Sequence, residues 1–231
     1  GHAGGVLQAI GSTGRLYATD RDPQAIAAAK RHLAQYADRL EVRQGCFAEV
    51  DSWLPGQSCD GVCMDLGISS PQVDHADRGF SFLKEGPLDM RMGPAQHLKA
   101  SDLVNEWDEE DLARLFRSLG EEPRARKIAQ AISQSRRVAK FETTSQLAQC
   151  VEQAVGGRSS KHHPATRVFQ ALRMEVNDEL GQLKHGLVTA WRVLKQGGRL
   201  ATISFHSLEA RLIKRFGHFW GASYEAGDEA D

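Results

Sequence analysis

The chain has 231 residues, which is enough for one large domain or for one domain with an insertion. With 41% apolar residues, 26% charged residues and a net charge of −1, its composition is ordinary for a globular protein and gives no overall attraction to polyanions. No apolar run approaches the ~20 residues that span a bilayer, so we expect no membrane segment. The four cysteines lack the paired spacing of a zinc site, so we expect no metal. We expect free thiols and a cytoplasmic protein.

The first part of the chain alternates between helical and strand patterns. The expected elements are a glycine-rich turn at 1–5, a helix at 6–10, a strand at 15–19 that ends at Asp20, a helix at 23–36, and strands at 40–44 and 61–64. Asp22 is the expected cap of the second helix, and Pro23 suits its first turn. Strands separated by helices predict a parallel sheet in an α/β fold.

The middle of the chain has a different character. Residues 67–98 show no clear periodicity, but their glycines, aromatics and methionines argue against a solvated linker, so we predict an ordered loop at the active site. Helical patterns follow at 109–119, 124–135 and 144–155. We therefore expect residues 99–159 to form a small all-helical domain inserted into the α/β domain.

The last part begins with apolar residues at every third or fourth position from Phe169 to Leu194, which predicts one long amphipathic helix from Thr166 onwards. Gly181 and Gly186 are points where it could bend. After it come a helix stop at 196–198, a buried strand at 199–205, a helix that Ser207 caps, and a polar, acidic and flexible tail at 221–231. The α/β domain then comprises 1–98 and 160–220.

The most informative stretch runs from Val62 to Gln72, where an apolar strand ends at Asp65 and the chain turns through Gly, Ser and Pro. Polar groups at the carboxyl end of a parallel strand lie where α/β folds bind ligands. Asp65 can accept hydrogen bonds, Gln72 offers an amide, and Ser69 and Ser70 add hydroxyls. A serine hydrolase is excluded because no GxSxG elbow surrounds either serine.

Three more positions follow predicted strands. Asp20 comes after the glycine turn and its strand, and its carboxylate suits the vicinal hydroxyls of a ribose, as in nicotinamide dinucleotides or S-adenosylmethionine. Phe47 follows the strand at 40–44 and either flanks an adenine ring or belongs to the core. His206 follows the strand at 199–205 and is either a wall of the acceptor pocket or a structural residue beside the cap.

Basic residues are concentrated between Glu121 and Arg173, where ten Lys and Arg stand against four Asp and Glu. Such clustering favours the binding of a polyanion. A solvated helical surface explains the same charges equally well.

The motifs, taken in order, resemble a known family. They are Gly1-His2 before a short helix, Asp20 to Pro23, Gly45 to Phe47, Asp65 to Gln72, Arg78 to Phe82, Pro87 to Met92, His163 to Arg167 and Ile203 to Glu209. The set is similar to the bacterial 16S ribosomal RNA cytosine-N4 methyltransferases, the RsmH or MraW family, over nearly the whole chain to about Phe216. The strand that would precede Gly1 and the strands after the Phe216 region are not recognisable.

The resemblance implies a Rossmann-like class I methyltransferase with a helical insertion. It implies S-adenosylmethionine as the cofactor and methylation of the exocyclic N4 amine of a cytidine in the decoding region of 16S RNA. By motif position, cofactor contacts fall on Gly1, His2, Asp20, Phe47, Asp65 and Gln72. The expected catalytic residues, whose acceptor groups could receive the amine proton, are Asp65, Ser69, Ser70 and His206.

The expected partner is 16S ribosomal RNA in the small ribosomal subunit, and a homodimer stays open. The target base must leave its stack to reach a buried methyl group. Phe80, Phe82 and His206 are candidates to stack on it or enclose it. Basic residues would hold phosphates, and contacts of this kind are expected at Arg136, Arg137, Lys140 and Arg167.

Three other readings compete with this one. A methyltransferase that acts on a protein or a small molecule would share the same cofactor residues. An NAD-dependent oxidoreductase fits Asp20 and the glycine turn equally but fits the turn from Asp65 to Gln72 poorly. A non-catalytic RNA-binding protein on a decayed enzyme fold would have lost polar groups at the strand ends, and the sequence shows no such loss.

Overall fold

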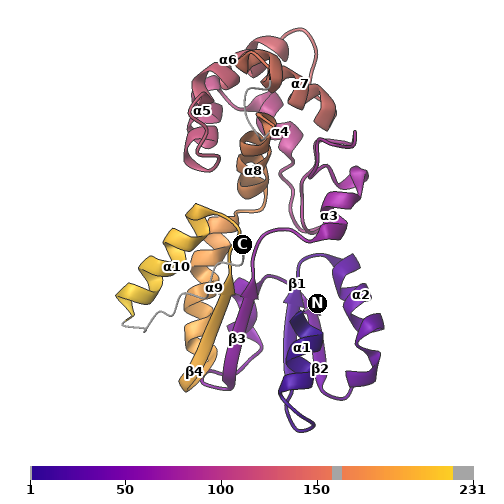
Figure 1. Cartoon of the computed structure of the whole chain (residues 1–231), viewed down its shortest axis with the longest axis vertical. Helices are drawn as coiled ribbons and strands as arrows, with labels where there is room; N and C mark the ends of the chain where they lie inside the picture. Colours follow the sequence, from indigo (N-terminus) through magenta and orange to yellow (C-terminus); the bar gives the residue numbers. More distant parts are fainter. Residues whose placement is uncertain (1, 158–162, 221–231) are drawn as a thin grey trace. The chain divides into compact units, whose positions relative to one another are not determined.

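Figure 1 shows a computed structural model of the chain, in which residues 2–157 and 163–220 are described. The chain divides into two compact units. Unit 1 comprises Gly1–Leu66 and Leu180–Asp231, and unit 2 comprises Gly67–Glu179. Unit 2 is therefore inserted into the sequence of unit 1. The tail expected at 221–231 lies outside the described residues.

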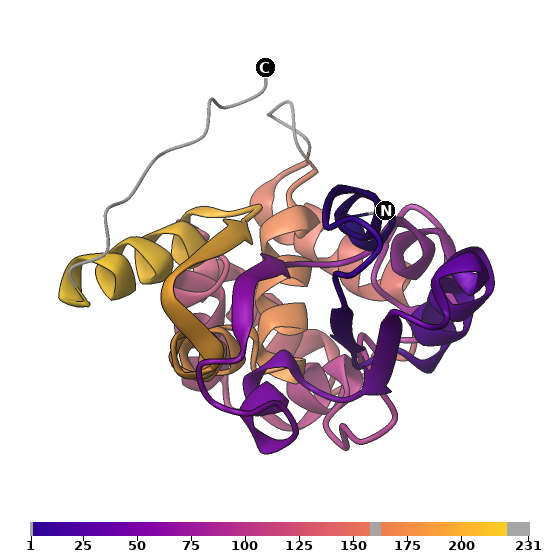
Figure 2. The ribbon, with the colours of Figure 1, turned by 90° about the horizontal axis from the view of Figure 1, so that it is seen from below.

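Unit 1 mixes helices with parallel strands. Its elements are α1 (His2–Ala9), β1 (Leu16–Asp20), α2 (Pro23–His32), the 3-10 helix η1 (Ala34–Tyr36), β2 (Leu40–Gln44), the 3-10 helix η2 (Phe47–Ser52), β3 (Cys59–Asp65), α9 (Glu179–Val193, which begins at the last residue of unit 2), β4 (Leu194–Ile203) and α10 (Ser207–Phe219). The strands form two parallel pairs, β1 with β2 and β3 with β4. Figure 2 shows β3 and β4 side by side. The predicted α/β content and parallel pairing are confirmed.

The β3–β4 pair differs in detail from the prediction. Gly61 lies opposite Arg199 and Asp65 opposite Ile203, but Cys59 lies opposite Leu194, so the register shifts within the pair. Because of this shift, the two glycines at 197–198 lie inside β4 as an irregularity of the ladder, and Gly197 has a φ of 79°. The helix stop expected at 196–198 is therefore wrong, because α9 already ends at Val193.

The start of α1 also corrects the prediction. The glycine-rich segment forms a helix from His2, whereas a turn was expected before a helix at 6–10. Leu7 is completely buried, and packing of one apolar side chain outweighs the weak helix propensity of Gly4 and Gly5. Gly1 lies outside the described residues. By contrast, Asp22 caps α2 as predicted, since its Oδ1 accepts a hydrogen bond from the Gln24 N–H at 2.9 Å.

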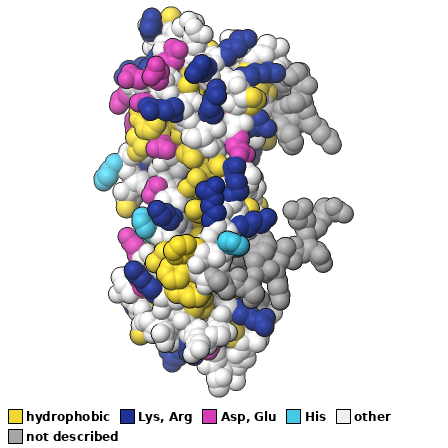
Figure 3. Space-filling view, turned by 90° about the vertical axis from the view of Figure 1, so that its left-hand side faces the viewer, with side chains coloured by type: hydrophobic (Ala, Val, Ile, Leu, Met, Phe, Trp, Pro, Cys, Tyr) yellow, Lys and Arg dark blue, Asp and Glu magenta, His cyan; other side chains and the backbone are white. Residues whose placement is uncertain are grey.

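Two helices cover the β3–β4 pair. Leu183, Leu187 and Ala190 of α9 share a buried cluster with Met64 and Leu66, and α10 adds partly buried apolar side chains to it. Each fully buried aliphatic side chain contributes about 1.5–3 kcal/mol. The far end of α10 exposes aromatic rings, of which Trp220 contacts Trp191, Phe216 and Phe219. Figure 3 views the side on which α10 lies in Figure 1 and shows hydrophobic side chains bordered by Lys and Arg.

Unit 2 is helical. Its elements are α3 (Ser70–Asp74), the 3-10 helix η3 (Ala76–Arg78), α4 (Ala100–Glu106), α5 (Glu109–Ser118), α6 (Ala125–Ser135), α7 (Thr144–Val155) and α8 (Ala165–Val176). The three predicted helices are confirmed as α5, α6 and α7, whereas the short helices α3 and α4 were missed. The predicted order of the loop at 67–98 is also confirmed, because Phe80, Leu88 and Met90 are buried in the core of this unit.

The long helix expected after Thr166 is two helices. The break falls at Asn177 and Asp178, and Asp178 has a φ of 47°, which no α-helix contains. Gly181 and Gly186, the expected weak points, lie inside α9. Among the described residues, none of the helices has the length and apolarity needed to cross a bilayer.

Candidate active site

His2 and Asp65 meet at the carboxyl end of β3. His2 Nδ1 lies 2.9 Å from Asp65 Oδ2, and both side chains are about half exposed. The short connection from α1 to β1 and their mutual packing make the two elements antiparallel, so the start of α1 lies at the end of β1. The structure therefore brings two predicted cofactor residues into contact, at the same end of unit 1 as Asp20.

Asp20 is exposed at the end of β1. Its Oδ1 accepts a hydrogen bond from the Asp22 N–H at 2.8 Å, and its main-chain carbonyl accepts one from the Gly45 N–H at 2.9 Å. These bonds fix the turns after β1 and β2, which hold the carboxylate at the strand end. An exposed carboxylate on a fixed turn is a suitable acceptor for a pair of hydroxyls.

Phe47 follows β2 and is partly buried. It packs against the cluster formed by β3 and α9. Its ring lies so close to Gly186 that a Cβ at that position would approach the ring carbons to 2.4 Å. This contact supports the core role of Phe47 that the sequence left open, and it explains why a glycine stands in the middle of α9.

The thiol of Cys63 is two residues from Asp65 on β3. Its pKa is raised, first because the sulfur is partly removed from water and second because the Asp65 carboxylate is negative, although the residue as a whole is exposed. Both causes disfavour the thiolate, which is the reactive form of cysteine. The end of β3 is therefore an acceptor-rich site without an activated thiol.

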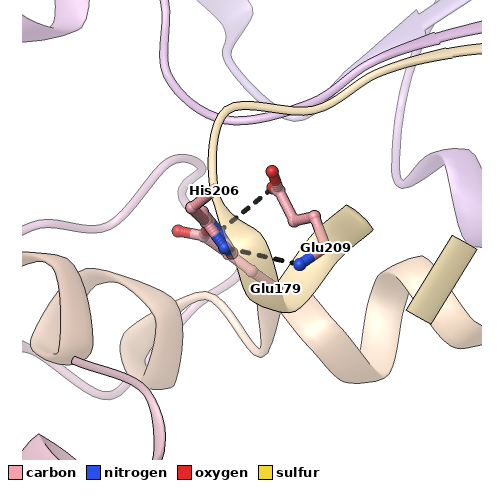
Figure 4. A group of neighbouring side chains, drawn as sticks. All are labelled: Glu179, His206 and Glu209. Carbon is pink, nitrogen blue, oxygen red and sulfur yellow. Dashed lines mark hydrogen bonds and ion pairs between the residues drawn. The ribbon is translucent and has the colours of Figure 1, made fainter. Parts of the chain in front are cut away.

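His206 follows β4 and caps α10. Its Nδ1 accepts a hydrogen bond from the Glu209 N–H at 3.4 Å, so the predicted cap, Ser207, is corrected to its neighbour. His206 Nε2 lies 3.3 Å from Glu209 Oε1 but makes no hydrogen bond among the described residues. Figure 4 shows both contacts as dashed lines, one from the imidazole to the Glu209 main-chain nitrogen and one to the Glu209 carboxylate. The imidazole is thus held between the Glu209 main chain and the Glu209 carboxylate, which explains its place at the start of α10.

Glu209 was missed from the sequence. It is 3% exposed, and its Oε2 accepts a hydrogen bond from the Phe205 N–H at 2.9 Å. The available signal was its position three residues after the cap His206, which is the spacing of a capping box. Phe205 was also missed, although it directly precedes that cap and is 67% exposed.

Ser69, Ser70 and Gln72 belong to unit 2, at the turn that begins α3. Gln72 is 7% exposed, and its Oε1 accepts a hydrogen bond from the Ser69 N–H at 3.0 Å. Both serines are exposed. The amide of Gln72 therefore builds the turn that presents the two hydroxyls.

The two aromatic residues predicted to stack on a base are engaged within unit 2. Phe80 is 8% exposed, and the Arg78 guanidinium lies 5.7 Å from its ring centre. Phe82 contacts Phe169 and His163, with ring centres 5.0 and 4.6 Å apart. The burial of Phe80 and the ring contacts of the partly buried Phe82 make both poor candidates for contact with a base.

The four predicted basic residues separate into two kinds. Arg136 donates to the Val104 carbonyl at 2.9 Å, and Arg167 donates to the Glu121 carbonyl at 3.1 Å. The first bond ties the end of α6 to α4, and the second ties α8 to the loop between α5 and α6. Arg137 and Lys140 are exposed, and no hydrogen bond or ion pair ties their side chains to other described residues. They are the better candidates to hold phosphates.

Comparison with known proteins agrees with the sequence motifs. A model of the MraW methylase family matches residues 1–224. The chain is 50% identical over 216 residues to the protein named ribosomal RNA small subunit methyltransferase H of Chelativorans sp. (strain BNC1), and this match covers 93% of the chain and 63% of the relative.

Two further relatives carry the same name. The one from Methylococcus capsulatus is 47% identical over 94% of the chain and 73% of its own length. The one from Rhizobium meliloti is 48% identical over 97% of the chain and 66% of its own length. The chain thus spans about two thirds of these relatives. It belongs to the MraW methylase family.

Proposed function

We propose that the protein transfers a methyl group from S-adenosylmethionine to the exocyclic N4 amine of a cytidine in the decoding region of 16S ribosomal RNA. The proposal includes a Rossmann-like arrangement of unit 1, with helical unit 2 as the inserted part for RNA recognition; unit 2 runs from Gly67 to Glu179 and so extends beyond the expected 99–159 on both sides. Family membership and the name of the relatives support ribosomal RNA as the substrate. The cofactor, the N4 atom and the decoding region come from the motif resemblance.

The contact between His2 and Asp65 is the observation that carries the proposal. It places a carboxylate and an imidazole at the carboxyl end of β3, and the packing of α1 on β1 brings this pair to the end of unit 1 where Asp20 lies. Carboxylates at the ends of two strands of unit 1 fit a cationic sulfonium and a ribose diol.

The residues of unit 1 suggest a division of roles. Asp20 would hold the ribose hydroxyls, and His2 would orient Asp65 through their hydrogen bond. When bound, S-adenosylmethionine supplies an electrophilic methyl group that needs no covalent activation. Asp65 would accept a hydrogen bond from the target amine, which favours tetrahedral nitrogen, and would then receive the proton. Alignment of the amine supplies much of the remaining rate.

The test is methyl transfer with tritiated cofactor. We expect label to enter 16S RNA in small ribosomal subunits or as naked RNA, and the position of the methyl group follows from nucleoside analysis. Asp65→Ala should lower the rate at least about 100-fold, as loss of a general base does. Asp60→Asn is the matched control, because Asp60 lies at the other end of β3, with an 88% exposed side chain paired to Lys195.

Two results would contradict the proposal. Label found only in protein or in small molecules would replace the RNA substrate, and the same family fold would then serve another acceptor. Near-normal transfer by the Asp65→Ala protein would remove Asp65 from the chemistry.

A further inference from the structure

Phe205 is an exposed aromatic ring at the candidate active site. It lies two residues beyond Ile203, which is paired with Asp65 across the β3–β4 ladder. The Leu66 N–H also donates to the Ile203 carbonyl at 3.0 Å, so the pairing continues past the end of β3. Phe205 therefore lies at the end of the β3–β4 pair that also carries Asp65, the proposed proton acceptor. The residue is 67% exposed, so most of its ring is uncovered.

The backbone of Phe205 is held more firmly than its exposure suggests. Its N–H donates to Glu209 Oε2 at 2.9 Å, while Glu209 Oε1 faces His206 Nε2 at 3.3 Å. Glu209 is 3% exposed, so one almost fully buried carboxylate holds both Phe205 and His206 in place. Burying a carboxylate costs free energy unless its oxygens are used, and here both oxygens face this turn. Such support of a single exposed ring is what a preorganised contact requires.

The other rings of the predicted set are already in use. Phe80 is buried, Phe82 packs on Phe169 and His163, and the His206 ring is held by Glu209. Phe47 packs against the cluster of β3 and α9. Of the five rings considered, which also include Phe47, Phe80, Phe82 and His206, the Phe205 ring is the one with an exposed face.

We propose that the Phe205 ring stacks on the pyrimidine base of the acceptor nucleotide and that Glu209 is a positioning residue for it. This inference rests on the proposed function, because it assumes that an extruded base enters the site beside Asp65. An aromatic face binds any base by stacking, and alanine substitution of such a ring weakens binding roughly 5- to 150-fold. Phe205 thus confers affinity for a planar base, while the choice of cytosine falls to polar groups.

The experiment compares Phe205→Ala, Phe205→Leu and Phe205→Tyr in methyl transfer to small-subunit RNA. We expect kcat/KM to fall roughly 5- to 150-fold for the alanine and leucine variants and to stay within about threefold of wild type for tyrosine, because only tyrosine keeps a ring. The Kd for S-adenosylmethionine should not change. The leucine variant separates stacking from simple apolar contact.

A binding readout makes the test independent of turnover. An oligonucleotide with a fluorescent cytosine analogue at the target position should be quenched by wild type and by Phe205→Tyr but not by Phe205→Ala. Phe219→Ala is the control, since Phe219 is 81% exposed on α10 of the same unit, away from the start of that helix. Equal quenching and equal kcat/KM for the alanine variants at 205 and 219 would overturn the proposal.

The role of Glu209 is tested by a double-mutant cycle. If Glu209 acts through Phe205, then Phe205→Ala should have a much smaller effect in the Glu209→Gln background than in wild type. Full additivity, with a folded Glu209→Gln protein by circular dichroism, would overturn the positioning role. If wild type methylates no RNA, the proposed function fails, and the fluorescence arm still decides whether Phe205 stacks on a base.

Discussion

The side-chain amide of Asn177 donates a hydrogen bond of 2.8 Å to the main-chain carbonyl of Met90, 87 residues earlier in the chain. Met90 is fully buried and has a φ of 62°, a conformation that costs a non-glycine residue about 1–2 kcal/mol. Asn177 also donates to the Arg173 carbonyl and accepts from the Met92 N–H and the Gln96 side chain. One buried amide therefore holds the strained loop against the end of α8.

Removal of this amide should destabilise unit 2. We expect Asn177→Ala to lower the free energy of unfolding by about 3 kcal/mol, because buried loop groups lose their partners. Urea denaturation followed by circular dichroism measures the change. Asn177→Asp keeps both acceptor contacts and loses both donors, so its cost should be substantial too. An alanine variant as stable as wild type would show that the loop does not depend on Asn177.

Asp89 and Arg91 should make the stability of unit 2 depend on pH. Burial works to raise the pKa of Asp89, but its hydrogen bonds and charge interaction with Arg91 outweigh burial and lower it below 3.8. The two side chains form a bidentate pair at 2.7 Å. Because the folded-state pKa is depressed, the stabilisation is complete above 3.8 and is lost as the pH falls through the folded value.

The variant Asp89→Asn removes this titration. It should cost about 2 kcal/mol at neutral pH, and the gap to wild type should close as the pH falls below 3.8. Urea titrations at several pH values measure the gap. Asp111→Asn is the control, because the Asp111–Arg114 pair is exposed and should contribute less than about 1 kcal/mol. A gap that is constant with pH would contradict the linkage.

Arg137 and Lys140 should bind RNA phosphates. Reversal of both to Glu is expected to weaken RNA binding roughly tenfold or more at low salt and to reduce the salt dependence by about two units of slope. Cofactor affinity should stay the same. The matched control is Lys30→Glu with Arg31→Glu, two exposed residues on α2 of unit 1. Equal loss of RNA affinity in both double variants would mean that the effect reflects net charge alone.

The thiol of Cys63 reports on the charge of Asp65. Because the carboxylate raises the pKa of Cys63, Asp65→Asn should lower that pKa and increase the thiolate fraction at a given pH. We expect alkylation of Cys63 by iodoacetamide at pH 8 to become about twofold to threefold faster, a modest effect because the site is exposed. Peptide mass spectrometry measures the rate. Asp60→Asn should leave it unchanged, and the same acceleration there would exclude a local effect of Asp65.

Much of the secondary structure follows from the sequence. The cap of α2, the strand at 40–44 and the helices α5 to α7 carry strong local signals, such as Asp22 before Pro23 and regular apolar spacing. The break at Asn177 and Asp178 carries no such signal, because the apolar spacing continues through it. Only the buried hydrogen bonds of Asn177 with residues 90–96 end the helix there.

The candidate site shows the same limit. The residues at strand ends, Asp20 and Asp65, could be found because an apolar run stops at a carboxylate in each case. The burial of Phe80 and the exposure of Phe205 could not be found in this way, because the sequence around each shows an aromatic residue next to polar ones. Which of two rings faces solvent depends on packing between segments far apart in the chain.

The pairing of β3 with β4 has a consequence for synthesis. Because all of unit 2 is encoded between these strands, β3 must wait until residue 203 has left the ribosome before it can find its neighbour. Closing so long a loop is costly while the intervening chain is unfolded, and much cheaper once it has condensed. Unit 2 should therefore become compact first on the growing chain, and the end of β3 that carries Asp65 should be among the last parts to mature.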